Sequence, residues 1–149
     1  MPDTSSHNLI DAVQQDHREV ERLLDAVESA SGDARRDAFA QLVEKLKAHE
    51  AAEQKVVHPL TTELGDADEA EALEAEESAA EKAIKELEGL DVDSPEFEAG
   101  FARLRSDVVQ HAEEEEREEH PLILSETSDD ELQRRGAEFE AAERTAAEG

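Results

Sequence analysis

The sequence predicts an all-α protein, an up-down-up-down four-helix bundle with a short C-terminal fifth helix. Three observations predict it. The 149-residue chain has only 6 Gly and 4 Pro and is rich in Ala, Glu, Leu and Lys, which favours helices. Apolar residues recur at helical spacing along four long stretches. The breaks between these stretches are short, so neighbouring helices should run antiparallel. We treat residues 1–149 as a single domain, with a core at 8–124 and a tail at 125–149.

Local signals set the ends of each predicted helix. A Ser-Gly-Asp stretch at 31–33 ends the first helix, and a glycine follows the second and the third. Ser94 followed by Pro95 begins the fourth helix, because it provides an N-cap and a proline at the first helical position. The capping box at 128–131 begins the fifth, which has few apolar anchors and which we expect to dock loosely. The predicted helices are 8–29, 34–64, 67–87, 95–124 and 129–145.

Composition excludes several classes of function. Lys plus Arg is 15 and Asp plus Glu is 42, so the formal charge is −27, which argues against nucleic acid and anionic membranes as partners. With no cysteine, the chain has no disulfide, thiolate metal site or Cys nucleophile. No apolar stretch approaches a membrane span or the core of a secretory signal, so we expect a cytoplasmic protein. His7 lies in the polar N-terminal stretch, and we assign it no role.

Polar residues interrupt the apolar stripe of every long helix. Buried unpaired charges cost several kcal/mol each, whereas a whole domain is stable by only about 5–15 kcal/mol. These side chains must therefore neutralise one another, contact water or bind a cation. Alternating helix directions should bring them together at one end of the bundle. The residues are His17, His49, Glu53, Glu77, His111 and Glu115.

An internal repeat supports a metal site. The motif H-x3-E-x4-H-P begins at His49 and again at His111, 62 positions later (111 − 49 = 62). His17 and Glu77 are related by a similar offset (77 − 17 = 60). The chain thus reads as two helical hairpins with pseudo-twofold symmetry. Imidazole and carboxylate ligands without sulfur suit a pair of Fe, Mn or Zn ions, and the alternative is a set of Glu–His ion pairs in a hydrated bundle end.

Three further residues are possible ligands. Nine positions separate His49 from His58, and on an ideal α-helix the two point in opposite directions. A π-bulge, or distortion by the following proline, would turn His58 and its counterpart His120 inward. The alternative for both is a helix-end histidine that interacts with the helix dipole. Glu81, one turn after Glu77, competes for the same role as Glu77.

These motifs resemble the hemerythrin-like (HHE cation-binding) family over about residues 9–124. The segments that carry the resemblance are DHREVERLL, HEAAEQKVVHPL, EESAAEKAIKEL and HAEEEEREEHPLI. It implies a four-helix bundle with a non-haem di-iron centre, whose ligands follow the order H, HxxxE, H, HxxxE. Glu77 stands where the family usually has a histidine. A carboxylate there makes the site more anionic, which favours the oxidised metal and argues against reversible oxygen carriage.

The leading hypothesis is a protein that binds two transition-metal ions and handles dioxygen, peroxide or nitric oxide. The resemblance favours iron as an oxo- or hydroxo-bridged pair, with manganese or zinc as alternatives. If the protein is an enzyme, it is a peroxide- or dioxygen-consuming di-iron oxidoreductase; no catalytic residue is identified. The alternatives are an iron or manganese buffering or sensing protein without turnover, and a metal-free helical interaction protein. We expect a monomer.

Overall fold

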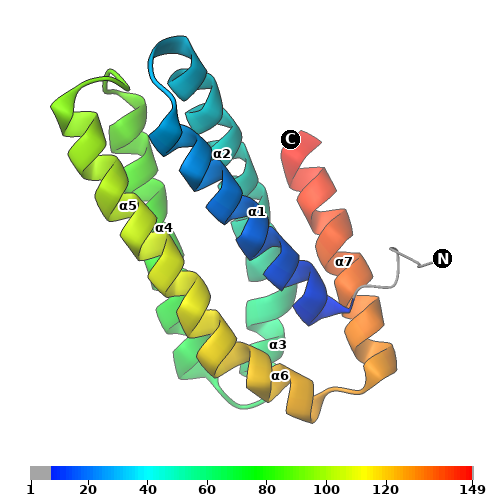
Figure 1. Ribbon diagram of the computed structural model, residues 1–149. Coiled ribbons are helices and arrows are strands. Elements are labelled where there is room, and N and C mark those ends of the chain that lie inside the picture. Colours follow the sequence, from blue (N-terminus) through cyan, green and yellow to red (C-terminus); the bar gives the residue numbers. More distant parts are fainter. Residues whose placement is uncertain (1–7, 149) are drawn as a thin grey trace.

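A computed structural model describes residues 8–148, and over this range the chain is helical with no strand (Figure 1). The all-α prediction is therefore confirmed, while His7 lies outside the described residues. Two short π-helical segments, η2 and η3, interrupt the second and fourth predicted helices. The elements are α1 (Leu9–Ser29), α2 (Gly32–Ala52), η2 (Glu53–Val57), α3 (His58–Glu63), α4 (Ala67–Glu88), α5 (Pro95–Glu114), η3 (Glu115–Glu119), α6 (His120–Glu126) and α7 (Asp129–Glu148).

Side-chain caps and glycines fix the helix ends. The backbone N–H of Asp11 donates to the Asn8 side chain (2.9 Å) at the start of α1. The Phe97 N–H donates to Ser94 Oγ (3.1 Å) at the start of α5, as the Ser-Pro signal predicts. Gly65, between α3 and α4, has a φ of 107°, a conformation that residues with a Cβ rarely adopt.

Four helical rods lie side by side: α1, α2–α3, α4 and α5–α6 (Figure 1). Their apolar side chains form two separate clusters. One surrounds Leu24, Leu46 and Phe101, and the other surrounds Val13 and Ile123. The sequence analysis predicts that the polar residues of the stripes meet at one end of the bundle. In the structure they lie between the two apolar clusters instead. Apolar side chains from η2, α3 and α6 cover that end, among them Val56, Leu60 and Ile123.

The C-terminal helix α7 packs firmly, contrary to the expectation of a loosely docked tail. It lies against α1 and α2 (Figure 1), and it buries Leu132, Gly136, Phe139 and Ala142. Two of these four residues are small, and a count of large apolar residues overlooks their burial. The Phe139 ring contacts the His49 ring edge-on, with 5.8 Å between the ring centroids.

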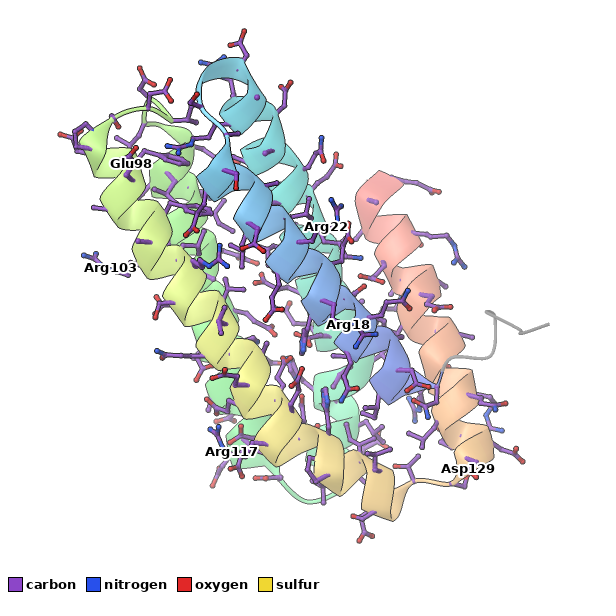
Figure 2. All side chains as sticks on the ribbon, viewed as in Figure 1. Arg18, Arg22, Glu98, Arg103, Arg117 and Asp129 are labelled. Atoms are coloured by element: carbon purple, nitrogen blue, oxygen red, sulfur yellow. The ribbon has the colours of Figure 1, made fainter. Side chains whose placement is uncertain are left out.

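Charged side chains cover the outer surface of the rods. Figure 2 shows Arg103 and Arg117 pointing away from the bundle. Arg105, on α5, pairs with Asp25 on α1 at 2.6 Å. Because such pairs are largely exposed, each contributes little to stability. Among the described residues, no helix is long and apolar enough to cross a membrane.

Candidate metal centre

The two π-helical segments turn the second histidine of each repeat toward the interior. Each segment begins at the glutamate of its HxxxE motif, Glu53 in η2 and Glu115 in η3. A π-turn holds about one residue more than an α-turn, so the residues that follow are rotated around the helix axis. His58 and His120 are consequently only 1% and 2% exposed. The distortion considered from the sequence is present in both repeats.

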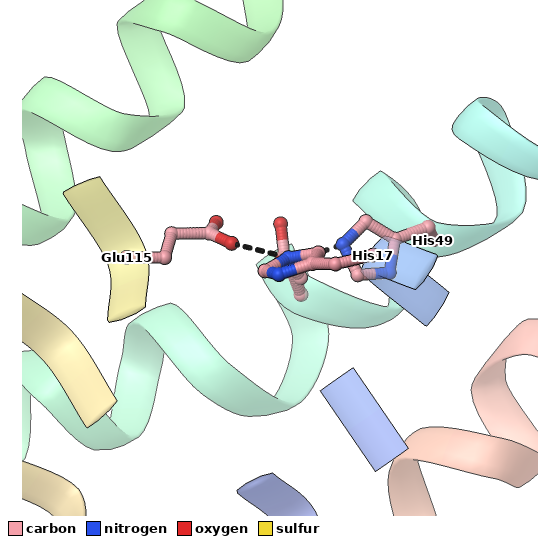
Figure 3. A group of neighbouring side chains, drawn as sticks. His17, His49 and Glu115 are labelled. Carbon is pink, nitrogen blue, oxygen red and sulfur yellow. Dashed lines mark hydrogen bonds and ion pairs between the residues drawn. The ribbon is translucent and has the colours of Figure 1, made fainter. Parts of the chain in front are cut away.

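Glu53 and Glu115 form the middle of a buried cluster, and both are fully buried. Glu115 lies 3.0 Å from His17 and 3.0 Å from His111, through different carboxylate oxygens. Glu53 lies 3.0 Å from His49 Nε2. Figure 3 shows the imidazole of His17 between Glu115 and His49. The two carboxylates therefore lie at the junction of side chains from α1, α2 and α5.

Two groups of side chains in this cluster could each hold a metal ion, because in each group the potential ligand atoms lie within 4.8 Å of one another. Both groups contain Glu53 and Glu115, so two ions held by them would share these carboxylates. The first group is His17, His49, Glu53 and Glu115, and the second is Glu53, His58, Glu77 and Glu115. His111 adjoins the second group, because its Nε2 lies 3.1 Å from Glu77 and 3.0 Å from Glu115.

The geometry of these contacts suits metal ligands better than hydrogen bonds. His49 Nε2 and Glu53 Oε2 are 3.0 Å apart, yet neither atom makes a hydrogen bond of acceptable geometry. Oε1 of Glu53 and Oε2 of Glu115 are also buried without a hydrogen-bond partner. Two ligand atoms at right angles, each about 2.1 Å from one ion, would be about 3.0 Å apart. The residues present therefore fit a bound cation.

Four outer carboxylates orient the imidazoles. In each of four histidines, Nδ1 lies 2.7–2.8 Å from a carboxylate, which leaves Nε2 directed at the cluster. The pairs are His17–Glu116, His49–Asp16, His58–Glu119 and His111–Glu76. Sequence reasoning missed all four carboxylates. One sequence signal could have found two of them. Asp16 immediately precedes His17, and Glu76 immediately precedes Glu77, so the two acidic residues are separated by the same 60 positions as the two predicted ligands (76 − 16 = 60).

The surrounding carboxylates keep the imidazoles protonated when no cation is bound. Burial opposes the charge of His58, but hydrogen bonds to Glu119 and Glu77 outweigh it and raise the His58 pKa to about 11. The same balance between burial and neighbouring carboxylates raises the pKa of three other imidazoles, those of His17, His49 and His111. A metal ion must displace these protons in order to bind.

The central carboxylates stay ionised despite their burial. Burial and the charge of Glu115 both raise the pKa of Glu53, but His49 and His111 outweigh them and hold that pKa at about 2. Burial likewise opposes ionisation of Glu115, yet His111 and His17 hold its pKa well below the usual value. The cluster therefore offers anionic oxygens to a cation near neutral pH.

His58 and His120 occupy equivalent positions in the repeats but have different surroundings. Glu119 contacts His58 and also accepts a hydrogen bond from Thr61 Oγ1 at 2.6 Å. At the repeat offset of 62, Glu119 corresponds to Val57 (119 − 57 = 62), and Thr61 corresponds to Ile123 (123 − 61 = 62). Val57 and Ile123 are both apolar and fully buried, so His120 has no counterpart of Glu119 or Thr61. Neither nitrogen of His120 has a hydrogen-bond partner, and burial lowers its pKa.

Of the three other predicted ligands, Glu77 belongs to one of the two ligand groups, and Glu81 and His120 belong to neither. Glu77 is 1% exposed, lies 2.9 Å from His58 and accepts a hydrogen bond from Gln54. Glu81 is exposed and belongs to neither group. His120 also belongs to neither group, although its ring stacks on that of His17 with 6.1 Å between centroids. The structure thus brings Glu77 into the cluster and leaves Glu81 outside.

The helical fold and the paired His/Glu groups define a helical protein suited to bind cations. The sequence of residues 8–123 matches the family model of the hemerythrin HHE cation binding domain. The chain therefore belongs to the hemerythrin HHE cation-binding domain family.

Two relatives extend this comparison. A crystal structure of a hemerythrin HHE cation binding domain-containing protein from Mycobacterium kansasii shares the fold, with a TM-score of 0.84 and 19% identity, over 95% of this chain and 88% of that one. A DNA nickase from Nostoc sp. is 23% identical over 141 residues, which are 94% of this chain. The chain spans only 40% of the length of that nickase.

Proposed function

We propose that this protein binds two neighbouring iron ions and uses them to react with a small oxidant: dioxygen, peroxide or nitric oxide. The observation that carries the proposal is the pair of ligand groups that share Glu53 and Glu115. A shared carboxylate can bridge two ions and hold them close together. Two adjacent iron ions supply Lewis acidity and electrons to an oxidant when they are bound.

The remaining side chains divide between the two ions. His17 and His49 would hold one ion, and His58, His111 and Glu77 would hold the other. We further assign His120 to the first ion, because it is buried beside His17 with both nitrogens unpaired. The outer carboxylates would fix the direction of each imidazole. Around this centre, we propose that the four rods form an up-down-up-down bundle, an arrangement that the short connections support.

Metal analysis tests the number of ions and the ligands. Protein equilibrated with Fe(II), Mn(II) or Zn(II) and then desalted should retain two ions per chain. His111→Ala should retain fewer, whereas His7→Ala should match the parent, because His7 lies outside the motifs. Equal retention by the two variants would remove His111 from the ligand set.

A second candidate is a buffer or sensor of iron or manganese without turnover. The formal charge of −27 favours it, because a strongly negative surface concentrates cations. Adding hydrogen peroxide in excess to the iron-loaded, reduced protein separates the two functions. An enzyme that disproportionates peroxide consumes many equivalents and releases dioxygen and water, because one peroxide molecule is oxidised for each one that is reduced. A buffer reacts once and stops. A metal-free interaction protein would retain no ion in the preceding experiment.

We propose no nucleic-acid partner, although one relative is a DNA nickase. The charge of −27 repels the phosphate backbone, and nucleic-acid binding proteins present basic surfaces instead. Protein at micromolar concentration should leave the electrophoretic mobility of a DNA duplex unchanged. A retarded band at physiological salt would contradict this part of the proposal.

A further inference from the structure

A cavity of about 290 Å³ lies beside the candidate metal centre. Four side chains of the centre line one part of its wall: His17, His49, Glu77 and His111. Apolar side chains from all four rods line the rest, among them Val20, Leu24, Leu46, Ala80 and Val108. The cavity therefore joins a metal-binding surface to an apolar wall.

Glu50 adds a polar group that the metal centre does not use. This residue follows His49, lines the cavity and is 5% exposed. Its Oε1 atom is fully buried and has no hydrogen-bond partner. A buried polar atom left without a partner destabilises the protein, because it has lost its hydrogen bonds to water. A ligand hydroxyl can both donate and accept, so it can pair with Glu50 and relieve that cost.

The rim of the cavity selects by charge. The polar residues that line it include the carboxylates Glu21, Glu76, Asp107 and Glu114. Together with the net charge of −27, these groups repel organic anions. An organic cation would have to leave water for an apolar wall, which is costly. The most favourable occupant is therefore neutral.

We propose that this cavity binds small neutral organic molecules that carry one hydroxyl-type group, R–OH or R–O–OH. The hydroxyl group pairs with Glu50 beside the metal centre, and the carbon skeleton packs against Val108, Leu46 and their apolar neighbours. An apolar cavity of about 150 Å³ holds benzene, so 290 Å³ accommodates a skeleton of about ten heavy atoms. This proposal deepens the proposed function. Only one part of it, the role of R–O–OH as an oxidant, rests on that function.

Calorimetry on the full chain loaded with zinc tests whether the cavity binds these molecules. Zinc is redox-silent, so the measured heat reports binding and not a redox reaction with the probe. The probes are 2-phenylpropan-2-ol and cumene hydroperoxide, which share one skeleton. Saturable binding of either probe, at one molecule per chain, is expected. Tighter binding of the hydroperoxide identifies R–O–OH as the ligand class, and tighter binding of the alcohol identifies R–OH. Absence of saturable binding by both probes overturns the proposal.

Matched variants locate the binding site. Ala80→Phe fills the cavity and should weaken binding at least tenfold. Ala75→Phe makes the same change at an exposed position of the same helix and should have no effect. Glu50→Leu should weaken binding of the alcohol and leave that of isopropylbenzene, which has no hydroxyl, unchanged. Thermal melts confirm that each variant is folded.

The charge argument and the metal centre have separate tests. Benzoate and 2-phenylethylamine should bind at least tenfold more weakly than the alcohol, and equal or tighter binding of either ion overturns the proposal. Equal effects of Ala80→Phe and Ala75→Phe overturn it as well. Zinc content is measured on the same samples. A protein that retains no metal but still binds the alcohol refutes the proposed function and leaves the cavity assignment standing.

Discussion

Metal binding should release about three to four protons per chain at pH 7. The number follows from four imidazoles whose pKa the surrounding carboxylates raise. In each of them, Nδ1 keeps its proton for the outer carboxylate, and Nε2 must lose its proton to coordinate an ion. Glu53 and Glu115 are ionised already, so they release none.

The assay is a titration of weakly buffered protein with zinc, followed by a pH indicator dye. The proton count also sets the pH dependence, because protons compete with the metal. Lowering the pH from 7 to 6 should reduce the overall zinc-binding constant by about three to four orders of magnitude. His111→Ala should lower the number of released protons by about one.

Cations that bind only to the acidic surface give a different result. Exposed carboxylates are ionised at pH 7, so they bind a cation without losing a proton. Calcium, which prefers oxygen ligands, serves as the control and should release no protons. If two zinc ions bind per chain and fewer than one proton is released, the imidazoles are not the ligands, and the reasoning about the centre is refuted.

Three further predictions concern residues around the centre. Glu119→Gln should weaken zinc binding by about 10–100-fold, because the His58 ring loses the carboxylate that orients it. Competition with a chelating dye measures the zinc affinity, and the exposed control Glu118→Gln should leave it unchanged. Phe139→Ala should destabilise the protein by about 3–5 kcal/mol in urea unfolding, whereas Leu124→Ala, at a half-exposed side chain, should cost less than about 1 kcal/mol. Burial raises the pKa of Glu50 to about 8, so its contribution to the stability of the metal-free protein is present near pH 4 and is lost as the pH rises to 8. Thermal melts of Glu50→Gln should therefore depend less on pH between 5 and 8, and an unchanged profile would contradict this assignment.

Sequence periodicity predicted the helices because burial of one face imposes it. The stripe that contains Leu24, Leu46 and Phe101 is buried as expected. The same spacing rule failed after Glu53 and Glu115, because it assumes an uninterrupted α-helix. A proline follows the second histidine of each repeat, and it lacks the N–H needed for a regular helical hydrogen bond. That signal is local, but it does not specify which way the helix relaxes.

Two of the four outer carboxylates could not be predicted individually. Glu116 and Glu119 belong to a run of charged residues in which every member looks alike in sequence. Only the π-helical segment decides that Glu119 is fully buried while Glu118 is exposed. The docking of α7 was missed for a related reason. Gly136 and Ala142 are buried together with Leu132 and Phe139, but residues so small do not stand out in a pattern of hydrophobic residues.

Glu77 makes the two halves of the candidate centre electrically unequal. Each half has two outer carboxylates, Asp16 and Glu116 on the His17 side and Glu76 and Glu119 on the His58 side. Only an ion beside His58 would also face Glu77, whereas the His17 side has His120, which has no hydrogen-bond partner. Negative surroundings stabilise a higher oxidation state. We therefore expect the ion beside His58 to have the lower reduction potential. When one electron is added to the oxidised pair, it should localise on the His17 side, giving a trapped mixed-valence state visible by electron paramagnetic resonance.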